Sequence, residues 1–288
     1  QQDFVLPNGS KGGRRWELRS SRTLLPMASG LPTGATRIAA LVDPSDWAAK
    51  AQLYDRLRRM RVIAALEKAG HTVPELEAGG DRDAALSALG RGLSGPARGL
   101  LRGWLDRYAA DAAALPLDRL RPAVEEHGPD PAALAAALGA DPARIMRRLA
   151  AMPPEDLPTP VGLAICDSSG VLTYRKPLPD FPMPRFGAAC PLWPLYRALS
   201  RPHVILAGPV MQVGRTGTLL WADALATPQA GPAVNADPLY QAQMLVRPLP
   251  QGADPPATPP QLGVACRVCP RESCEGRREP SILASARR

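Results

Sequence analysis

The 288-residue chain has few aromatic residues, few lysines and few histidines. It holds three Phe, five Trp, five Tyr and three His, and its 35 basic residues are 31 Arg and only four Lys. With so few aromatic side chains, the core is expected to consist mainly of Leu, Val and Ala. No apolar run approaches the ~20 residues that a membrane-spanning helix requires. We therefore predict a cytoplasmic protein without a membrane segment.

Proline and glycine are abundant, with 34 and 25 residues. This composition excludes a simple helical bundle or coiled coil. The length indicates about two domains.

The formal net charge of +8 permits an anionic partner such as DNA, but an Arg-rich surface without such a partner explains the same number. The chain begins at Gln1, without an initiator Met or a signal peptide, so we expect its natural beginning to be missing.

The hydrophobic pattern predicts an α+β protein, in which an Arg-rich helical N-terminal half precedes a β-rich mixed C-terminal domain. Four prolines between Met152 and Pro160 mark the boundary between these halves. The predicted parts are a short β and turn segment over residues 1–45, a helical domain over 46–152 and a β-rich domain over 161–284.

Two groups of arginines on predicted helices are candidates for DNA contacts. The first lies on a helix expected over residues 47–69, and the second on a helix-turn-helix expected over 131–149, with its turn at Gly139. Arginine side chains bind phosphate, although solvent-exposed and packing helices carry the same pattern. The candidates are Arg56, Arg58, Arg59 and Arg61 in the first helix and Arg144, Arg147 and Arg148 in the second.

Three of the five cysteines form a C-x2-C-x4-C motif, made by Cys266, Cys269 and Cys274. An odd number of cysteines without a secretory signal argues against a disulfide framework. Three thiolates in one loop suit either zinc or an iron–sulfur cluster, and spacing alone favours neither.

The best candidate for a fourth ligand is Cys190, in the segment Phe186-Gly-Ala-Ala-Cys-Pro-Leu-Trp193. Gly187 permits close backbone approach, and Pro191 fixes the following turn. The remaining cysteine, Cys166, lies in an alternating apolar strand and is expected in the core.

These two cysteine segments, together with residues 141–149 and the hairpin expected over 161–175, resemble the C-terminal effector region of bacterial short-chain fatty acyl transcriptional regulators. The resemblance covers roughly residues 130–284. It implies a domain that senses short-chain acyl-CoA and holds an iron–sulfur cluster, of the 4Fe–4S type, through the four cysteines; zinc is the alternative metal. It also implies a homodimeric DNA-binding regulator that is not an enzyme.

Members of this family begin with a phage-repressor-like (XRE-type) helix-turn-helix and continue into a metallopeptidase-like (IrrE-like) domain. Before residue 130 the sequence shows no repressor domain and no H-E-x-x-H motif, so the end of the helical part is interpreted as a degenerate IrrE-like region. The phosphates of coenzyme A would require basic partners, for which Arg175, Lys176 and Arg185 are the candidates.

Two other functions remain open at this point. One is an iron–sulfur protein with a redox or electron-transfer function. This hypothesis is weaker, because the sequence has no Gly-rich dinucleotide motif and no Cys/His or Ser/His/Asp pattern. The other is an interaction module stapled by zinc.

Overall fold

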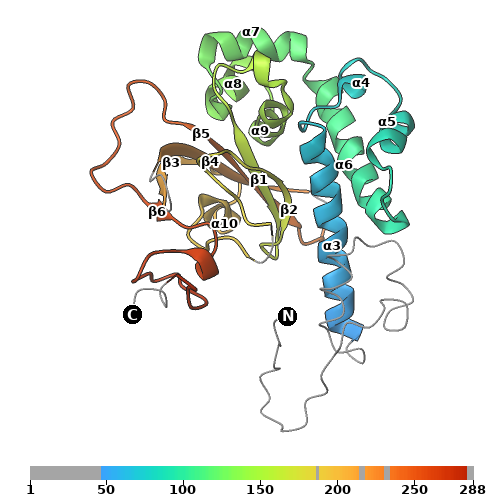
Figure 1. Ribbon diagram of the computed structural model, residues 1–288. Coiled ribbons are helices and arrows are strands. Elements are labelled where there is room, and N and C mark those ends of the chain that lie inside the picture. Colours follow the sequence, from blue (N-terminus) through green and yellow to red (C-terminus); the bar gives the residue numbers. More distant parts are fainter. Residues whose placement is uncertain (1–46, 186–187, 214–217, 230–233, 284–288) are drawn as a thin grey trace.

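The computed structural model describes the backbone of residues 47–185, 188–213, 218–229 and 234–283, with side chains from Leu57 onward. The segment predicted over residues 1–45, the side chain of Arg56, and Phe186 and Gly187 lie outside this description. Helices occupy the first half of the described chain, and a sheet occupies most of the second half (Figure 1). The helices before the sheet are α3 (Trp47–Lys68), α4 (Pro74–Glu77), α5 (Arg82–Leu89), α6 (Gly95–Ala114), α7 (Leu117–His127), α8 (Pro131–Leu138) and α9 (Pro142–Ala151).

Short polar residues and proline determine where helices α8 and α9 begin. The carboxylate of Asp130 accepts hydrogen bonds from two backbone N–H groups in the first turn of α8, and Asp141 does the same for α9. Each helix has proline at its first position, where no N–H partner is needed. Gly139 ends α8 in the left-handed conformation, with φ of 60°. The helix-turn-helix shape expected from the sequence is therefore present.

Six strands form one sheet with the order β2-β1-β5-β4-β3-β6. Neighbouring strands are antiparallel, except for the short parallel pairing of β3 with β6. The α+β class predicted from the sequence is confirmed. The elements of this part are the 3-10 turn η2 (Pro154–Asp156), β1 (Gly162–Asp167), β2 (Leu172–Lys176), α10 (Pro194–Leu199), β3 (Leu206–Gln212), β4 (Leu219–Pro228), β5 (Tyr240–Pro248), β6 (Gln261–Leu262) and the 3-10 turn η3 (Cys266–Val268).

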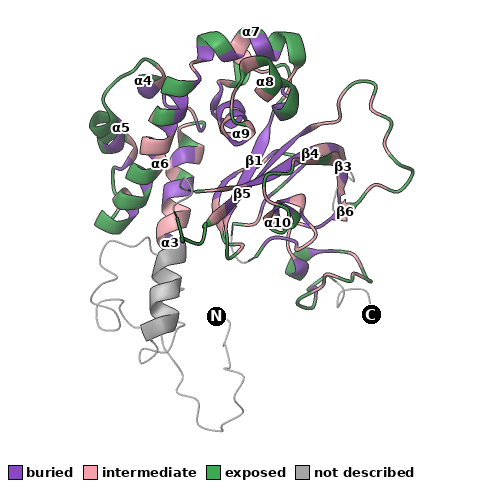
Figure 2. Ribbon diagram, turned by 180° about the vertical axis from the view of Figure 1, so that it is seen from behind, coloured by how far each residue is buried: buried purple, intermediate pink, exposed green. Residues whose placement is uncertain are grey.

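The two faces of the sheet bury different sets of side chains. Because successive strand residues point to opposite faces, Leu163 and Ile165 of β1 pack with the helices α3 to α9, while Ala164 and Cys166 pack on the side of α10. Figure 2 shows the sheet as mostly buried between these layers. The core on the first face contains residues from both halves of the chain and includes Met152 and Val161, at either end of the proline-rich segment.

Within the described ranges, no helix combines the length and the apolar character that crossing a bilayer would require.

Candidate functional site

A cavity of about 430 Å³ lies between helices α3, α6 and α9 and the inner face of the sheet. Exposed residues at its edge, among them Gly99, Gly103 and Gln229, show that it opens to solvent. Its apolar wall comes from three helices and two strands. The members of that wall are Val62, Ile63, Leu66, Leu100, Trp104, Tyr108, Ala151, Leu163, Ile165 and Tyr174.

Helix α6 supplies the largest share of the cavity wall because its residues repeat at helical spacing. Trp104, Arg107, Tyr108 and Asp111 are three or four positions apart and therefore lie on one helix face. The Trp104 ring packs against Tyr108, with ring centroids 5.1 Å apart, and stacks on Tyr174 of β2 at 6.2 Å. This face thus presents aromatic and charged side chains side by side.

Two glycines on α6 keep the mouth of the cavity open. Gly99 and Gly103 line it one helical turn apart, and a methyl group on either residue would meet no other atom within 4 Å. Glycine in a helix interior costs roughly 1 kcal/mol relative to alanine. The space at these positions is therefore obtained at some expense of helix stability.

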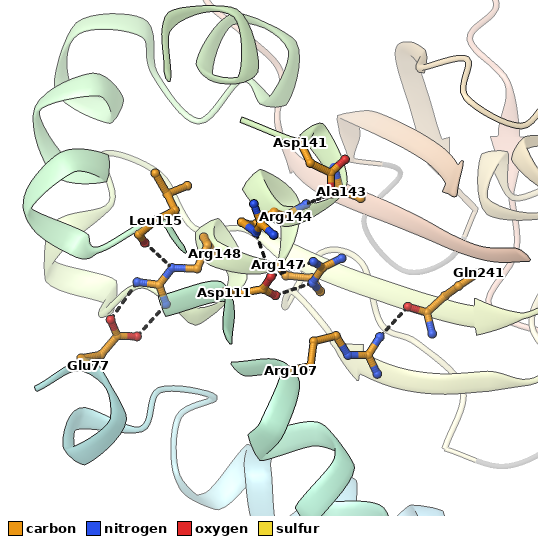
Figure 3. Close-up of polar contacts among 10 residues, drawn as sticks. All are labelled: Glu77, Arg107, Asp111, Leu115, Asp141, Ala143, Arg144, Arg147, Arg148 and Gln241. Carbon is orange, nitrogen blue, oxygen red and sulfur yellow. Dashed lines mark hydrogen bonds and ion pairs between the residues drawn. The ribbon is translucent and has the colours of Figure 1, made fainter. Parts of the chain in front are cut away.

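Asp111 is the centre of the polar part of the wall (Figure 3). Its buried carboxylate accepts hydrogen bonds from Arg147 Nε at 2.6 Å and Arg147 Nη2 at 2.9 Å, and from Arg144 Nε at 3.2 Å. The Gln243 side-chain amide is oriented so that its nitrogen donates to the Ala143 carbonyl oxygen at 3.2 Å and its oxygen accepts from Arg147 Nη1 at 2.9 Å. The network therefore links α6, α9 and strand β5.

Arg107 stands beside this network on the cavity wall. Its Nη1 donates a hydrogen bond to Gln241 Oε1 of β5 at 2.6 Å (Figure 3). Burial, reinforced by the positive charge of Arg147 and opposed by the negative charge of Asp111, lowers the pKa of Arg107 from its ordinary value. Loss of hydration is thus the main cost of the charged form of Arg107, and its direct hydrogen-bond partner is a neutral amide.

Arg148 is held in the interior on the other side of α9. It is 1% exposed, donates to both carboxylate oxygens of Glu77 at 2.7 Å each, and donates through Nε to the Leu115 carbonyl oxygen at 2.9 Å. The guanidinium groups of Arg147 and Arg148 therefore both form ion pairs within the protein. Arg144 also pairs with Asp111, but its side chain stays 35% exposed. These contacts hold α9 to α4, α6 and the sheet, and the assignment of the three arginines to DNA stays a prediction.

Three of the arginines predicted on the first helix, Arg58, Arg59 and Arg61, are half-buried. Arg59 lines the cavity, Arg61 donates to the carbonyl oxygen of Gly92, and Arg58 lies beside them. The assignment of these residues to DNA stays a prediction.

None of the three basic residues predicted to bind coenzyme A lines the cavity. Arg175 is buried and forms an ion pair with Glu67 at 2.6 Å. Lys176 donates to the Ala150 carbonyl oxygen at 2.7 Å, and burial lowers its pKa to about 8. Arg185 is exposed. The first two therefore join strand β2 to the helices.

A second, much smaller cavity is lined by Cys190 and by residues between Gly263 and Arg277. Figure 1 shows that this C-terminal segment lies beside β6 and away from α7 to α9. All four cysteines predicted as ligands line this cavity, although Cys190 is 76 residues before Cys266 in sequence. The segments are tied together by the hydrogen bond from the Cys190 backbone N–H to the Val264 carbonyl oxygen at 3.0 Å. The indole N–H of Trp193 donates to the Gly263 carbonyl oxygen at 2.8 Å.

Close packing around the cysteines explains the glycine in this segment. A Cβ atom on Gly263 would lie 3.1 Å from the Cys269 sulfur and 3.8 Å from the Cys190 sulfur. Three arginines near the cysteines donate to backbone carbonyl oxygens: Arg271 to Gln261, Arg277 to Cys266 and Arg278 to Ala189.

The cysteine set fits a soft metal by donor type and number. The cavity between the thiols is about 10 Å³, roughly the room of a single water molecule. Among the described residues, no three Cys, His, Asp or Glu side chains are placed so that they could hold a metal ion as they stand. The thiol side chains would therefore have to turn toward a common point, and for a multi-iron cluster the surrounding loop would have to widen. Cys166 lies apart, in the core beneath α10.

Sequence reasoning did not find the larger cavity. Trp104, Arg107, Tyr108 and Asp111 are not among the candidate residues named from the sequence. Two signals were available: charged residues share a helix face with the aromatic stripe, and Gln241 and Gln243 alternate with apolar residues in a buried strand.

The family of the C-terminal part follows from its match to known proteins. Residues 154–287 match the family model described as "Short-chain fatty acyl coenzyme A regulator, C-terminal". The C-terminal part of the chain is therefore similar to this family over residues 154–287. The resemblance predicted from the sequence is thus confirmed, with a start at residue 154 rather than near residue 130.

Three curated proteins that are similar to this chain are named as regulators. The propionyl-CoA carboxylase regulator of Cereibacter sphaeroides is 28% identical over 209 residues, which are 67% of this chain and 44% of the relative. The HTH-type transcriptional regulator PrpR of Mycobacterium tuberculosis is 29% identical over 202 residues, 66% of this chain and 41% of the relative. The HTH-type transcriptional regulator RamB of the same species is 27% identical over 217 residues, covering 70% and 45%.

The chain thus spans less than half the length of the curated relatives that it matches. A solved structure of a Mycobacterium tuberculosis transcriptional regulator has a similar fold, with a TM-score of 0.57 and 24% identity over 79% of this chain and 70% of that one. None of these names is that of an enzyme, in agreement with the prediction of a non-enzymatic regulator.

Proposed function

We propose that this chain is the ligand-sensing part of a bacterial transcriptional regulator and that its 430 Å³ cavity receives the acyl end of a short-chain acyl-CoA ester. The observation that carries the proposal is the position of this cavity, which lies where the family domain meets helices α3, α6 and α9. Its volume is within the range of roughly 300–1,000 Å³ that is typical of small-molecule sites.

The chemistry of the wall suits a short acyl chain. Val62, Ile63 and Leu66 face Trp104 and Tyr174 across the cavity, so an apolar chain of a few carbons would exchange water for apolar contacts. Each buried methylene contributes about 0.8 kcal/mol, which gives the cavity a means of distinguishing acyl lengths. The opening beside Gly99 and Gly103 offers the path by which the coenzyme A part would reach solvent.

A ligand in this position would contact elements from both halves of the chain at once. Strands β1 and β2 form one side of the cavity, and α3, α6 and α9 form the other. Binding would therefore favour one packing of the helices on the sheet over others. In a regulator this change in packing would alter DNA binding. A homodimer is expected, since regulators of this kind commonly read two half-sites.

We propose further that Cys190, Cys266, Cys269 and Cys274 hold a metal group, with a 4Fe–4S cluster as the first candidate and zinc as the second. An iron–sulfur cluster would add sensitivity to redox conditions, whereas zinc would only stabilise the C-terminal segment. The nearby guanidinium groups of Arg271 and Arg277 would offset part of the negative charge of four thiolates. Iron, sulfide and zinc analysis of protein purified without oxygen distinguishes the two.

The experiment for the proposed function is fluorescence anisotropy with a promoter-containing DNA fragment and the full-length regulator, with and without propionyl-CoA. The expected result is a change in DNA affinity on adding propionyl-CoA that free coenzyme A does not produce. Equal DNA affinity under all three conditions, in protein that is folded by circular dichroism, would contradict the proposal.

A further inference from the structure

Four arginines and two carboxylates of the described chain line the 430 Å³ cavity, and one of these arginines, Arg148, pairs with Glu77 outside the wall. Asp111 accepts hydrogen bonds from Arg144 and Arg147 at both of its oxygens. Asp167 also lines the cavity, but its Oδ1 accepts from the Ser169 hydroxyl and from two backbone N–H groups of the following turn. Both carboxylates are therefore engaged by other donors.

Arg107 is the cation that this arrangement leaves with a neutral partner. Within the described part of the chain its guanidinium forms no ion pair, and its side-chain hydrogen bond is to the amide oxygen of Gln241. A half-buried guanidinium without a carboxylate is unfavourable, since it loses hydration without gaining an opposite charge. An anion entering the cavity would remove this deficit.

We propose that Arg107 and Gln241 form an anion-binding subsite inside the cavity that recognises a carboxylate or phosphate group of the ligand. Arginine presents its N–H groups in a planar fork that matches both anions. Because Gln241 Oε1 already accepts from Arg107, the amide holds the guanidinium in place and directs its own Nε2 donor group to the same neighbourhood. The Asp111 network fixes the adjacent Arg147 and so prevents it from taking this role.

This inference rests on the proposed function, and the anion has two sources in such a ligand. One is the terminal carboxylate of a dicarboxylic acyl group, in which case the subsite would select acidic over neutral acyl chains. The other is a phosphate of coenzyme A, in which case the subsite would bind all acyl-CoA esters and ignore the acyl group.

The test compares wild-type protein with Arg107→Met by calorimetric titration of three ligands: propionyl-CoA, methylmalonyl-CoA and propionyl-pantetheine, which has no phosphate. Loss of a charge-assisted hydrogen bond predicts an affinity lower by about 10- to 100-fold. If the anion is a carboxylate, only methylmalonyl-CoA is weakened. If it is a phosphate, both CoA esters are weakened and propionyl-pantetheine is not.

Two further variants keep the test independent of folding defects. Gln241→Glu would place a carboxylate beside Arg107, so it should abolish anion binding while retaining a partner for the guanidinium. Arg102→Met removes an exposed arginine of the same helix, paired with Asp83 at 2.7 Å, and should leave all affinities unchanged. Wild-type affinities in folded Arg107→Met for every ligand would overturn the proposal.

A direct probe separates this inference from the proposed function. Methylmalonate and inorganic pyrophosphate, added as bare anions, should raise the thermal midpoint of wild-type protein but not that of Arg107→Met. If no CoA ester binds and a bare anion still acts through Arg107, the proposed function fails and the subsite stands. If neither CoA esters nor bare anions act on the wild type, both fail.

Discussion

Replacing Asp111 by Asn tests whether the polar network holds the helices on the sheet. The carboxylate accepts three hydrogen bonds from two arginines at distances between 2.6 and 3.2 Å, and its side chain is 8% exposed. The amide keeps the shape but removes the charge and turns one acceptor into a donor, leaving Arg144 and Arg147 uncompensated. Removing one partner from a buried ion pair costs about 3–5 kcal/mol.

This loss is large against the total stability of a domain, which is about 5–15 kcal/mol. Urea unfolding followed by circular dichroism would measure it. The control is Asp83→Asn, whose carboxylate pairs with Arg102 at the surface and should contribute less than about 1 kcal/mol. A cost below about 1 kcal/mol for Asp111→Asn as well would refute the reasoning, since the network would then contribute no more than a surface pair.

Three other predictions follow from single residues. Burial lowers the pKa of His71 to about 4, so the unfolded chain binds more protons than the folded one between that value and the ordinary 6.5. The free energy of unfolding should therefore fall by about 2 kcal/mol from about pH 7.5 to about pH 5. His71→Asn should remove this pH dependence, and asparagine tolerates the φ of 63° at this position. Urea titrations of both proteins at the two pH values would measure the difference. Cys190→Ala should reduce the bound metal measured by elemental analysis, and full retention would remove Cys190 from the ligand set. Gly103→Ala should raise the thermal midpoint, by the equivalent of up to about 1 kcal/mol, because the new methyl group meets no other atom within 4 Å; a lower midpoint would show that this position is not open.

Much of the fold could be predicted because its signals are local. The helix expected over residues 47–69 is observed over Trp47–Lys68, and the hairpin expected over 161–175 is observed as β1 and β2. Helix α7 was not predicted. It contains Pro122, which ordinarily argues against a helix, and it forms nevertheless because Leu120 and Val124 pack into the core.

The proximity of Cys190 to Cys266, Cys269 and Cys274 could be predicted from the sequence, because three closely spaced thiols indicate a metal site that needs a fourth ligand. The larger cavity could not, since it depends on long-range packing. Arg107 and Gln241 are 134 residues apart, and Arg148 and Glu77 are 71 apart. The sequence alone also gives no sign that Arg144 and Arg147 pair with Asp111, since these partners are more than 30 positions apart.

Calorimetric titration of propionyl-CoA into wild-type protein and into Gly103→Leu tests most directly whether an acyl-CoA ester binds in the 430 Å³ cavity. The Cβ atom at this position meets no other atom within 4 Å and leucine favours a helix over glycine, so the variant should fold with a thermal midpoint no lower than that of the wild type. If the acyl group enters the cavity, one ligand should bind per wild-type chain, and the affinity should be lower by about tenfold or more in the variant. Equal affinity in both proteins would show that the acyl-CoA ester does not enter this cavity.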